Sequence, residues 1–185
     1  MRKLIYSMGV SLDGFIAGPD GAIDWSAPDE ELHRFHNQQA REVGAQLYGR
    51  RLYEAMLPWE AAEERPEAAE PVLEFARIWK DTPKVVFSRT LARVEGNARL
   101  VGEGAGEEAV RLKEQPGGGL AVGGAGLAST FIKLGLIDEY RQFVSPVVLG
   151  GGTPYFPALG ASIDLELLET RTFGSRVVYL RYRVR

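Results

Sequence analysis

Apolar positions along the chain recur with two spacings, which predict strands and helices in turn. Residues 4–8 form a largely apolar run that is typical of a buried strand. The loop at 11–21 contains several turn-forming residues and is long enough to act as a lid. A helix with one apolar face is expected from about Ser26, which can cap it, to Gly44, which can end it.

The same two spacings continue to the C-terminus. A surface segment is expected at 57–69, which is rich in Pro, Glu and Ala, and strict alternation over 176–184 predicts a last strand paired with 164–169. Other strands are expected at 45–48, 84–88, 120–122 and 139–149, and other helices at 51–56, from about 70, at 103–114 and from about 125. This order predicts an α/β fold with a mostly parallel central sheet, flanking helices and antiparallel C-terminal strands. A length of 185 residues suits a single domain over 1–185.

Charge and composition exclude several function classes. The formal net charge of -3 gives no electrostatic reason to expect nucleic acid as the main partner. No apolar run is long enough for a membrane helix, and we expect a cytoplasmic protein. Cysteine is absent, which removes disulfides, thiolate nucleophiles and cysteine zinc sites. His33 and His36 lie three apart, but no third ligand completes a metal site, so we expect ordinary helix residues and no metal.

A glycine-rich turn follows the strand at 120–122. Gly123, Gly124, Ala125 and Gly126 stand between that strand and the next helix. Bare backbone and free N–H groups at a helix start suit a phosphate group. A tight turn with close helix–strand packing would use the same residues, so this turn does not identify a function by itself.

Arginines follow two other predicted strands. Gly49-Arg50-Arg51 comes after one strand and Ser88-Arg89 comes after another. Ligands collect at the carboxyl ends of parallel strands, so these side chains can converge on one anion. A 2′-phosphate on an adenine ribose would satisfy them, which favours NADPH over NADH, whereas the alternative is a set of solvated surface arginines. An NAD-dependent dehydrogenase of the doubly wound class would instead show an acidic residue after the second strand.

An acidic segment opens the first predicted helix. Reduction of a C=N bond needs a hydride donor and a proton source near the ring. Asp29, Glu30 and Glu31 follow Trp25 and Pro28, and a carboxylate there can anchor a ring or relay a proton. Helix capping explains Asp29 and Glu31 equally well; Glu30 is the candidate proton relay on the grounds of the family resemblance given below.

The ordered set of motifs resembles the dihydrofolate reductase superfamily over nearly the whole chain. More closely, it is similar to stand-alone relatives of the reductase domain of the bifunctional riboflavin-biosynthesis deaminase/reductase. The motifs are SLDGFIA (11–17), YGRRLYE (48–54), FSR (87–89), VGGAGL (122–127), GLIDE (135–139) and PVVLGGG (146–152). The resemblance implies a dihydrofolate reductase-like fold and NADPH as hydride donor.

The resemblance also implies roles for individual residues. Gly49, Arg50, Arg51, Ser88 and Arg89 would surround the adenosine ribose and its phosphate, and Gly123, Gly124, Ala125, Gly126 and Leu127 would hold the pyrophosphate. Gly9, Ile16 and the loop to Gly21 would cover the nicotinamide, and Tyr6, Met8 and Trp25 would border the substrate.

The substrate side departs from both relatives. Trp25, Pro28 and Glu30 match the spacing of dihydrofolate reductases, but Phe143 takes the place of the threonine that supports their acid. Residues 57–60 (LPWE) replace the Asp-Pro and Arg stretch that is typical of the riboflavin enzyme. We therefore expect an NADPH-dependent reductase, in the form of a homodimer, that acts on a pteridine- or pyrimidine-like ring. The closest activities by resemblance are reduction of 5-amino-6-(5-phosphoribosylamino)uracil and of dihydrofolate. The rival is a non-catalytic NADPH-binding module that has lost turnover.

Overall fold

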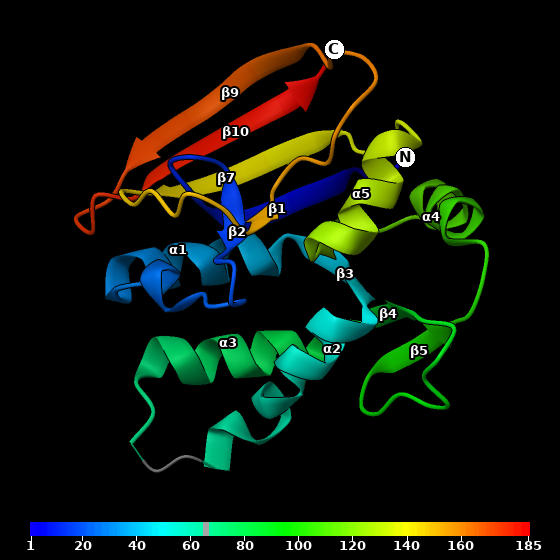
Figure 1. The fold of residues 1–185 in the computed structure, drawn as a ribbon. Helices are drawn as coiled ribbons and strands as arrows, with labels where there is room; N and C mark the ends of the chain where they lie inside the picture. Colours follow the sequence, from blue (N-terminus) through cyan, green and yellow to red (C-terminus); the bar gives the residue numbers. More distant parts are fainter. Residues whose placement is uncertain (65–66) are drawn as a thin grey trace.

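One eight-stranded sheet forms the centre of the computed structural model, which describes residues 1–64 and 67–185 (Figure 1). Its strands are β1 (Leu4–Ser11), β3 (Val43–Gly49), β4 (Lys84–Phe87), β5 (Ala98–Val101), β6 (Gly119–Gly123), β7 (Glu139–Ser145), β9 (Leu165–Thr172) and β10 (Val178–Val184). Their order is β5-β4-β3-β6-β1-β7-β10-β9. The first six pair in parallel, and β10 runs antiparallel to β7 and β9. The predicted mostly parallel sheet with antiparallel C-terminal strands is confirmed.

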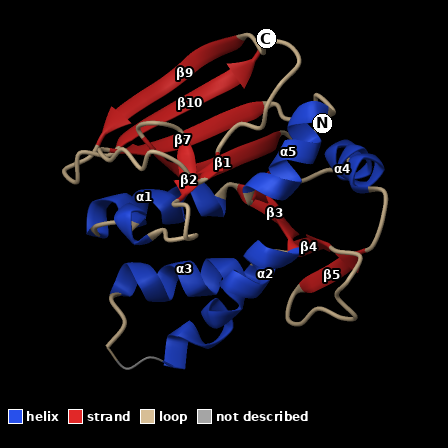
Figure 2. Ribbon diagram, viewed as in Figure 1, coloured by secondary structure: helices blue, strands red, loops and turns tan. Residues whose placement is uncertain are grey.

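Helices flank this sheet, and α1 and α3 lie side by side in Figure 2. The helices are α1 (Glu30–Arg41), α2 (Arg50–Met56), α3 (Glu70–Asp81), α4 (Ala105–Glu114) and α5 (Ala125–Lys133), with short 3-10 segments η1 (Asp24–Ser26) and η2 (Leu57–Glu64). A second, two-stranded sheet pairs β2 (Phe15–Ala17) with β8 (Thr153–Pro154). It joins the loop after β1 to the loop after β7.

Alternation along the strands gives the central sheet two different faces. Leu4, Tyr6 and Leu120 belong to the main core, which includes Phe131 of α5 and Leu112 of α4. The next residue along each strand faces the opposite side, as the two-residue period of a strand requires. That side is covered by α1, α2 and α3, and it carries polar side chains at the centre of the sheet.

The first helix begins later than the sequence suggested. Asp29 is its cap and accepts a hydrogen bond from the backbone N–H of Leu32 at 2.8 Å. Ser26 lies in η1, where its hydroxyl donates to the carbonyl of Ile23 at 2.7 Å. The predicted cap at Ser26 is therefore wrong, because two helix starts lie close together here and the carboxylate caps the longer one.

Gly44 does not end α1 but lies inside β3, which starts directly after the helix. A side chain at this position would press against the backbone of Gly118, with its Cβ 2.9 Å from the Gly118 nitrogen. Close approach of two backbones explains this glycine, whereas the sequence suggested helix termination.

The segment expected on the surface packs in part against the molecule. Ala62 is fully buried, and the ring of Trp59 stands edge-on to Phe75 of α3, with centroids 4.6 Å apart. Residues 65 and 66, which also fall in this segment, lie outside the described residues. This packing places η2 next to α2 and α3, on the helix-covered side of the sheet that carries the polar side chains.

Candidate active site

A cavity of about 520 Å³ lies between the polar face of the sheet and α1, α2 and α3. Strands β1, β3, β6 and β7 provide its floor, and the helices and η2 provide its walls. We call it the main cavity. Its lining consists of Ile5, Ser7, Met8, Pro28, His33, His36, Gln39, Ala40, Val43, Gln46, Tyr48, Leu52, Met56, Trp59, Phe75, Ala121, Val122, Gly123 and Arg141. Apolar walls with a few polar groups on the floor are typical of a site for a small organic molecule.

Two histidines of α1 contribute to one wall of the main cavity. The ring of His36 packs against Phe143 at 4.2 Å between centroids, and burial together with His33 lowers the pKa of His36 to about 4. Burial also lowers the pKa of His33, against the opposing charge of Glu74. Both imidazoles are therefore neutral at pH 7. Sequence reasoning gave them no role, although their spacing of three placed them on one helix face.

Arg141 of β7 stands on the floor of the main cavity with only 5% of its side chain exposed. Its Nε donates to Glu139 Oε1 at 2.7 Å, and its Nη1 donates to Gln39 Oε1. Burial alone would raise the pKa of Glu139, but hydrogen bonds and charges from Arg181 and Arg141 lower it on balance. The sequence analysis missed Arg141, because a charged residue in a strand gives no sign of which face it will occupy.

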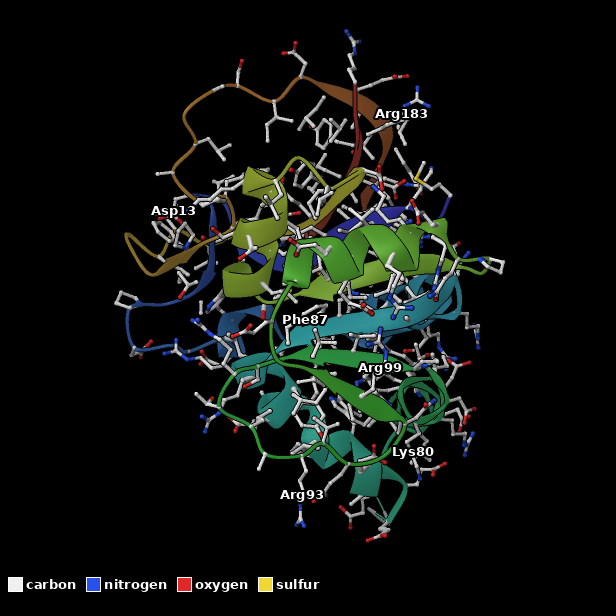
Figure 3. All side chains as sticks on the ribbon, turned by 90° about the vertical axis from the view of Figure 1, so that its right-hand side faces the viewer. Asp13, Lys80, Phe87, Arg93, Arg99 and Arg183 are labelled. Carbon is white, nitrogen blue, oxygen red and sulfur yellow. The ribbon has the colours of Figure 1, made fainter. Side chains whose placement is uncertain are left out.

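A second cavity, of about 500 Å³, lies at the carboxyl ends of β4 and β5. We call it the strand-end cavity. It is lined by Phe87, Ser88, Arg89, Val101, Gly102, Glu103, Gly104, Ala105 and Thr130. Phe87, labelled in Figure 3, lies at the end of β4 that borders this cavity. The structure thus places two residues of the proposed adenosine-phosphate site, Ser88 and Arg89, on one surface.

Arg50 reaches the same region from the start of α2. Its Nη1 donates to Thr90 Oγ1 at 3.0 Å, and its Nε donates to Glu54 at 2.9 Å. Arg51 is exposed and does not line either cavity. Glu103 was not among the predicted site residues, and it adds an acidic group to the strand-end cavity, which Arg89 also lines. The charge at this end of the site is consequently mixed.

The glycine-rich turn adjoins the main cavity, and α5, which starts from it, reaches the strand-end cavity at Thr130. Gly123 ends β6 and lines the main cavity, where an added Cβ would meet the side chain of Leu52. Gly124 takes the N-cap position of α5 with φ +84°, and no side chain caps that helix. An added Cβ on Gly126 would meet nothing within 4 Å. The backbone N–H groups of the first turn of α5, which begins with Ala125, Gly126 and Leu127, are therefore available to an anion.

The loops after β1 and β7 are tied together by Asp13, whose position appears in Figure 3. Its carboxylate accepts the backbone N–H groups of Leu149 at 3.1 Å and Gly150 at 2.7 Å, as well as the hydroxyl of Ser11 at 2.7 Å. The motifs at 11–17 and 146–152 are thus two halves of one connection. Nearby, Gly9 packs against Ser26, Ile16 lies in β2, and Gly21 is an exposed turn residue with φ +83°.

Met8 is the one proposed substrate residue that lines the main cavity. Tyr6 is fully buried on the opposite face of the sheet, where it stacks on Tyr155 at 4.2 Å, because strand alternation separates it from its neighbour Ser7. Phe143 is buried in a cluster with Phe35 of α1 and lies behind His36.

Trp25 and Glu30 also lie outside the lining of both cavities. The indole of Trp25 donates to the carbonyl of Ala22 at 3.1 Å. Glu30 is the first residue of α1, where it is exposed and pairs with Arg34 at 2.7 Å. Its position gives no support to a role as proton relay.

Among the residues that the structure describes, no three His, Asp or Glu side chains gather as a metal site would require. Within the same part of the chain, no helix combines the length and apolar character needed to span a bilayer.

Comparison with known proteins identifies the family. The family model described as the RibD C-terminal domain matches residues 2–179. The uncharacterized protein YyaP of Bacillus subtilis (strain 168) is 37% identical over 187 residues, covering 98% of this chain and 94% of YyaP.

Solved structures agree on the fold. A putative riboflavin biosynthesis protein from Shewanella sp. PV-4 superimposes with a TM-score of 0.79 at 23% identity, covering 100% of this chain and 99% of that one. Dihydrofolate reductase from Enterococcus faecalis, complexed with NADP(H), gives 0.66 at 14% identity, covering 99% and 96%. The predicted dihydrofolate reductase-like fold is confirmed, and the chain belongs to the RibD C-terminal domain family.

Proposed function

We propose that this protein is a reductase that uses NADPH to reduce a flat heterocycle bound in the main cavity. The observation that carries the proposal is that the turn at Gly123 and Gly124 adjoins the main cavity and starts α5, whose Thr130 lines the strand-end cavity. A site for an extended dinucleotide needs polar side chains around the adenosine phosphate, exposed backbone N–H groups at the pyrophosphate and an enclosed pocket for the reactive ring.

The residues present fit such a cofactor. Ser88 and Arg89 would hold the ribose phosphate, with Arg50 beside them through Thr90. The start of α5 would receive the pyrophosphate, because no side chain caps this helix and the space around Gly126 is open. When bound, NADPH supplies the hydride.

The protein's own contribution is to orient the substrate ring and to exclude water. Leu52, Met56 and Phe75 give the main cavity apolar walls, while Gln39 and Arg141 give it a polar floor. Exclusion of water strengthens each electrostatic contact on that floor and protects the transfer from side reactions. Glu30 receives no role in this proposal, since it is exposed and paired with Arg34.

The experiment measures binding of NADPH and NADH to the wild-type protein and to Arg89→Ala. We expect NADPH to bind more tightly to the wild type. Loss of Arg89 should weaken the binding of NADPH by about 1–3 kcal/mol, as expected for a charge-assisted hydrogen bond, and leave the binding of NADH nearly unchanged. Arg93→Ala is the matched control, because Arg93 is an exposed arginine of the same loop that lines neither cavity. Equal affinity for the two cofactors would overturn the NADPH assignment.

One observation favours a second candidate, an NADPH-binding module without turnover. Among the described residues that line the main cavity there is no carboxylate, and its two histidines are neutral at pH 7. The floor therefore lacks an ordinary acid to deliver a proton. Oxidation of NADPH on addition of pteridine or pyrimidine substrates, followed at its absorbance band, would exclude this candidate. Binding without turnover across both classes would support it.

A further inference from the structure

The floor of the main cavity carries hydrogen-bond donors whose orientation is fixed by other side chains of the protein. Arg141 and Ser7 are register partners on β7 and β1, so their side chains point to the same face of the sheet. Both line the cavity, together with Gln39, which reaches down from α1. A ligand that enters between the apolar walls therefore meets these groups at its far edge.

The orientation of the Gln39 amide is fixed by two donors. Its Oε1 accepts from Arg141 Nη1 and from the hydroxyl of Tyr179, the latter at 3.2 Å. With the carbonyl occupied, the Nε2 group remains as a donor. The Gln39 side chain thus presents N–H groups and no free carbonyl to the cavity.

Arg141 also keeps hydrogen-bond donors that are not engaged within the protein. Its Nε is engaged with Glu139 and its Nη1 with Gln39, while no partner for Nη2 occurs among the residues that the structure describes. A guanidinium has five N–H groups and accepts no hydrogen bond. The unpaired donors of this buried side chain lie on the floor of the main cavity, so a ligand can accept hydrogen bonds from them.

Positive charge also remains on this floor after the ion pairs are counted. Glu139 is shared by Arg141, by Arg181 at 2.7 Å and by Lys3 at 3.4 Å. Glu42 stands 3.7 Å from Arg141 and Glu169 stands 3.7 Å from Arg181, and both are 40% exposed or more. One buried carboxylate divided among three cations leaves Arg141 incompletely neutralised.

We propose that Arg141, with Gln39, determines substrate specificity by binding an oxygen acceptor on the edge of a planar ring in the main cavity. This inference rests on the proposed function, which places the substrate ring there. A ring edge that presents carbonyl oxygens matches the donors of Arg141 and Gln39. A ring edge that presents amino groups meets donors and a positive charge, because the described lining contains no carboxylate.

The test compares two probes of the same size, pteridine-2,4-dione and pteridine-2,4-diamine, by calorimetry without added cofactor. The dione should bind the wild type at least about tenfold more tightly than the diamine, as one hydrogen bond to a charged group implies. Arg141→Met should abolish this preference, and Arg141→Lys should retain part of it. Arg183→Met is the matched control, since Arg183 is an exposed arginine that pairs with Glu166 outside the cavity.

Each result decides the proposal. Equal binding of the two probes by the wild type, or a preference that survives in Arg141→Met, overturns it. If Arg141→Met does not fold, Gln39→Met replaces it, with a reduced preference expected and an unchanged one contradicting the proposal. Absence of NADPH binding by the wild type would refute the proposed function separately, because the probe comparison needs no cofactor.

Discussion

On one face of the central sheet, Leu4 and Leu120 pack into an apolar core with Phe131 of α5; on the other, Ser7 and Arg141 form the floor of the main cavity. The two faces are built from the same strands, and a shift of one residue separates them. The first face has the composition of a protein interior, and the second adds a buried ion pair between Glu139 and Arg141 at the proposed substrate site. Both faces contribute to stability, and the proposed ligand recognition belongs to the second.

The largest expected effect comes from the apolar face. Phe131→Ala should lower the free energy of unfolding by about 4 kcal/mol, because the side chain is fully buried and its loss leaves a cavity. Met56→Ala, in the half-buried wall of the main cavity, should lower the free energy of unfolding by a clearly smaller amount. Urea unfolding measures both, and equal losses would remove the distinction between the two faces.

Glu139→Gln should give the next largest effect, about 3 kcal/mol, because it leaves Arg141 buried without its carboxylate. The pKa of Glu139 is lowered in the folded protein, so its stabilising contribution is present above the unfolded-state value of 4.5. That contribution is lost as the pH falls through the lower folded-state pKa. Unfolding free energies measured between pH 7 and pH 3 should therefore fall less steeply in Glu139→Gln than in the wild type. A parallel fall in both proteins would contradict the assignment.

The alternation of strands and helices, and hence the sheet, could be predicted from the sequence, because hydrophobic period is a local property. The position of Ser88 and Arg89 at a strand end could also be predicted, and both line the strand-end cavity, while their role as ligand groups stays a prediction. Neither conclusion required knowledge of contacts between distant segments.

The floor of the main cavity could not be predicted in this way. Arg141 and Gln39 are 102 residues apart and meet only in the folded chain. Tyr6 was expected at the substrate and Ser7 was not, because alternation alone does not say which face will be filled by helices α4 and α5. Glu30 was expected in the site because Trp25, Pro28 and Glu30 match the spacing of dihydrofolate reductases, while α1 starts at Glu30 itself and turns its carboxylate to solvent.

The smallest expected effect concerns the strand-end cavity. Glu103 lines this cavity, as Arg89 does, and would repel the ribose phosphate of NADPH. Glu103→Gln should strengthen NADPH binding by about twofold, a small change because exposed charges are screened, and leave NADH unchanged or slightly weaker. Glu107→Gln, an exposed glutamate of α4 outside the cavity, is the control. Weaker NADPH binding in Glu103→Gln would place the phosphate elsewhere.

The most direct test of the central claim is a crystal structure with NADPH and pteridine-2,4-dione bound together. We predict the ribose phosphate against Ser88 and Arg89, the pyrophosphate at the start of α5, and the nicotinamide facing the dione across the end of β6. NADPH bound away from the turn at Gly123 and Gly124, or the two ligands held too far apart for hydride transfer, would contradict the account.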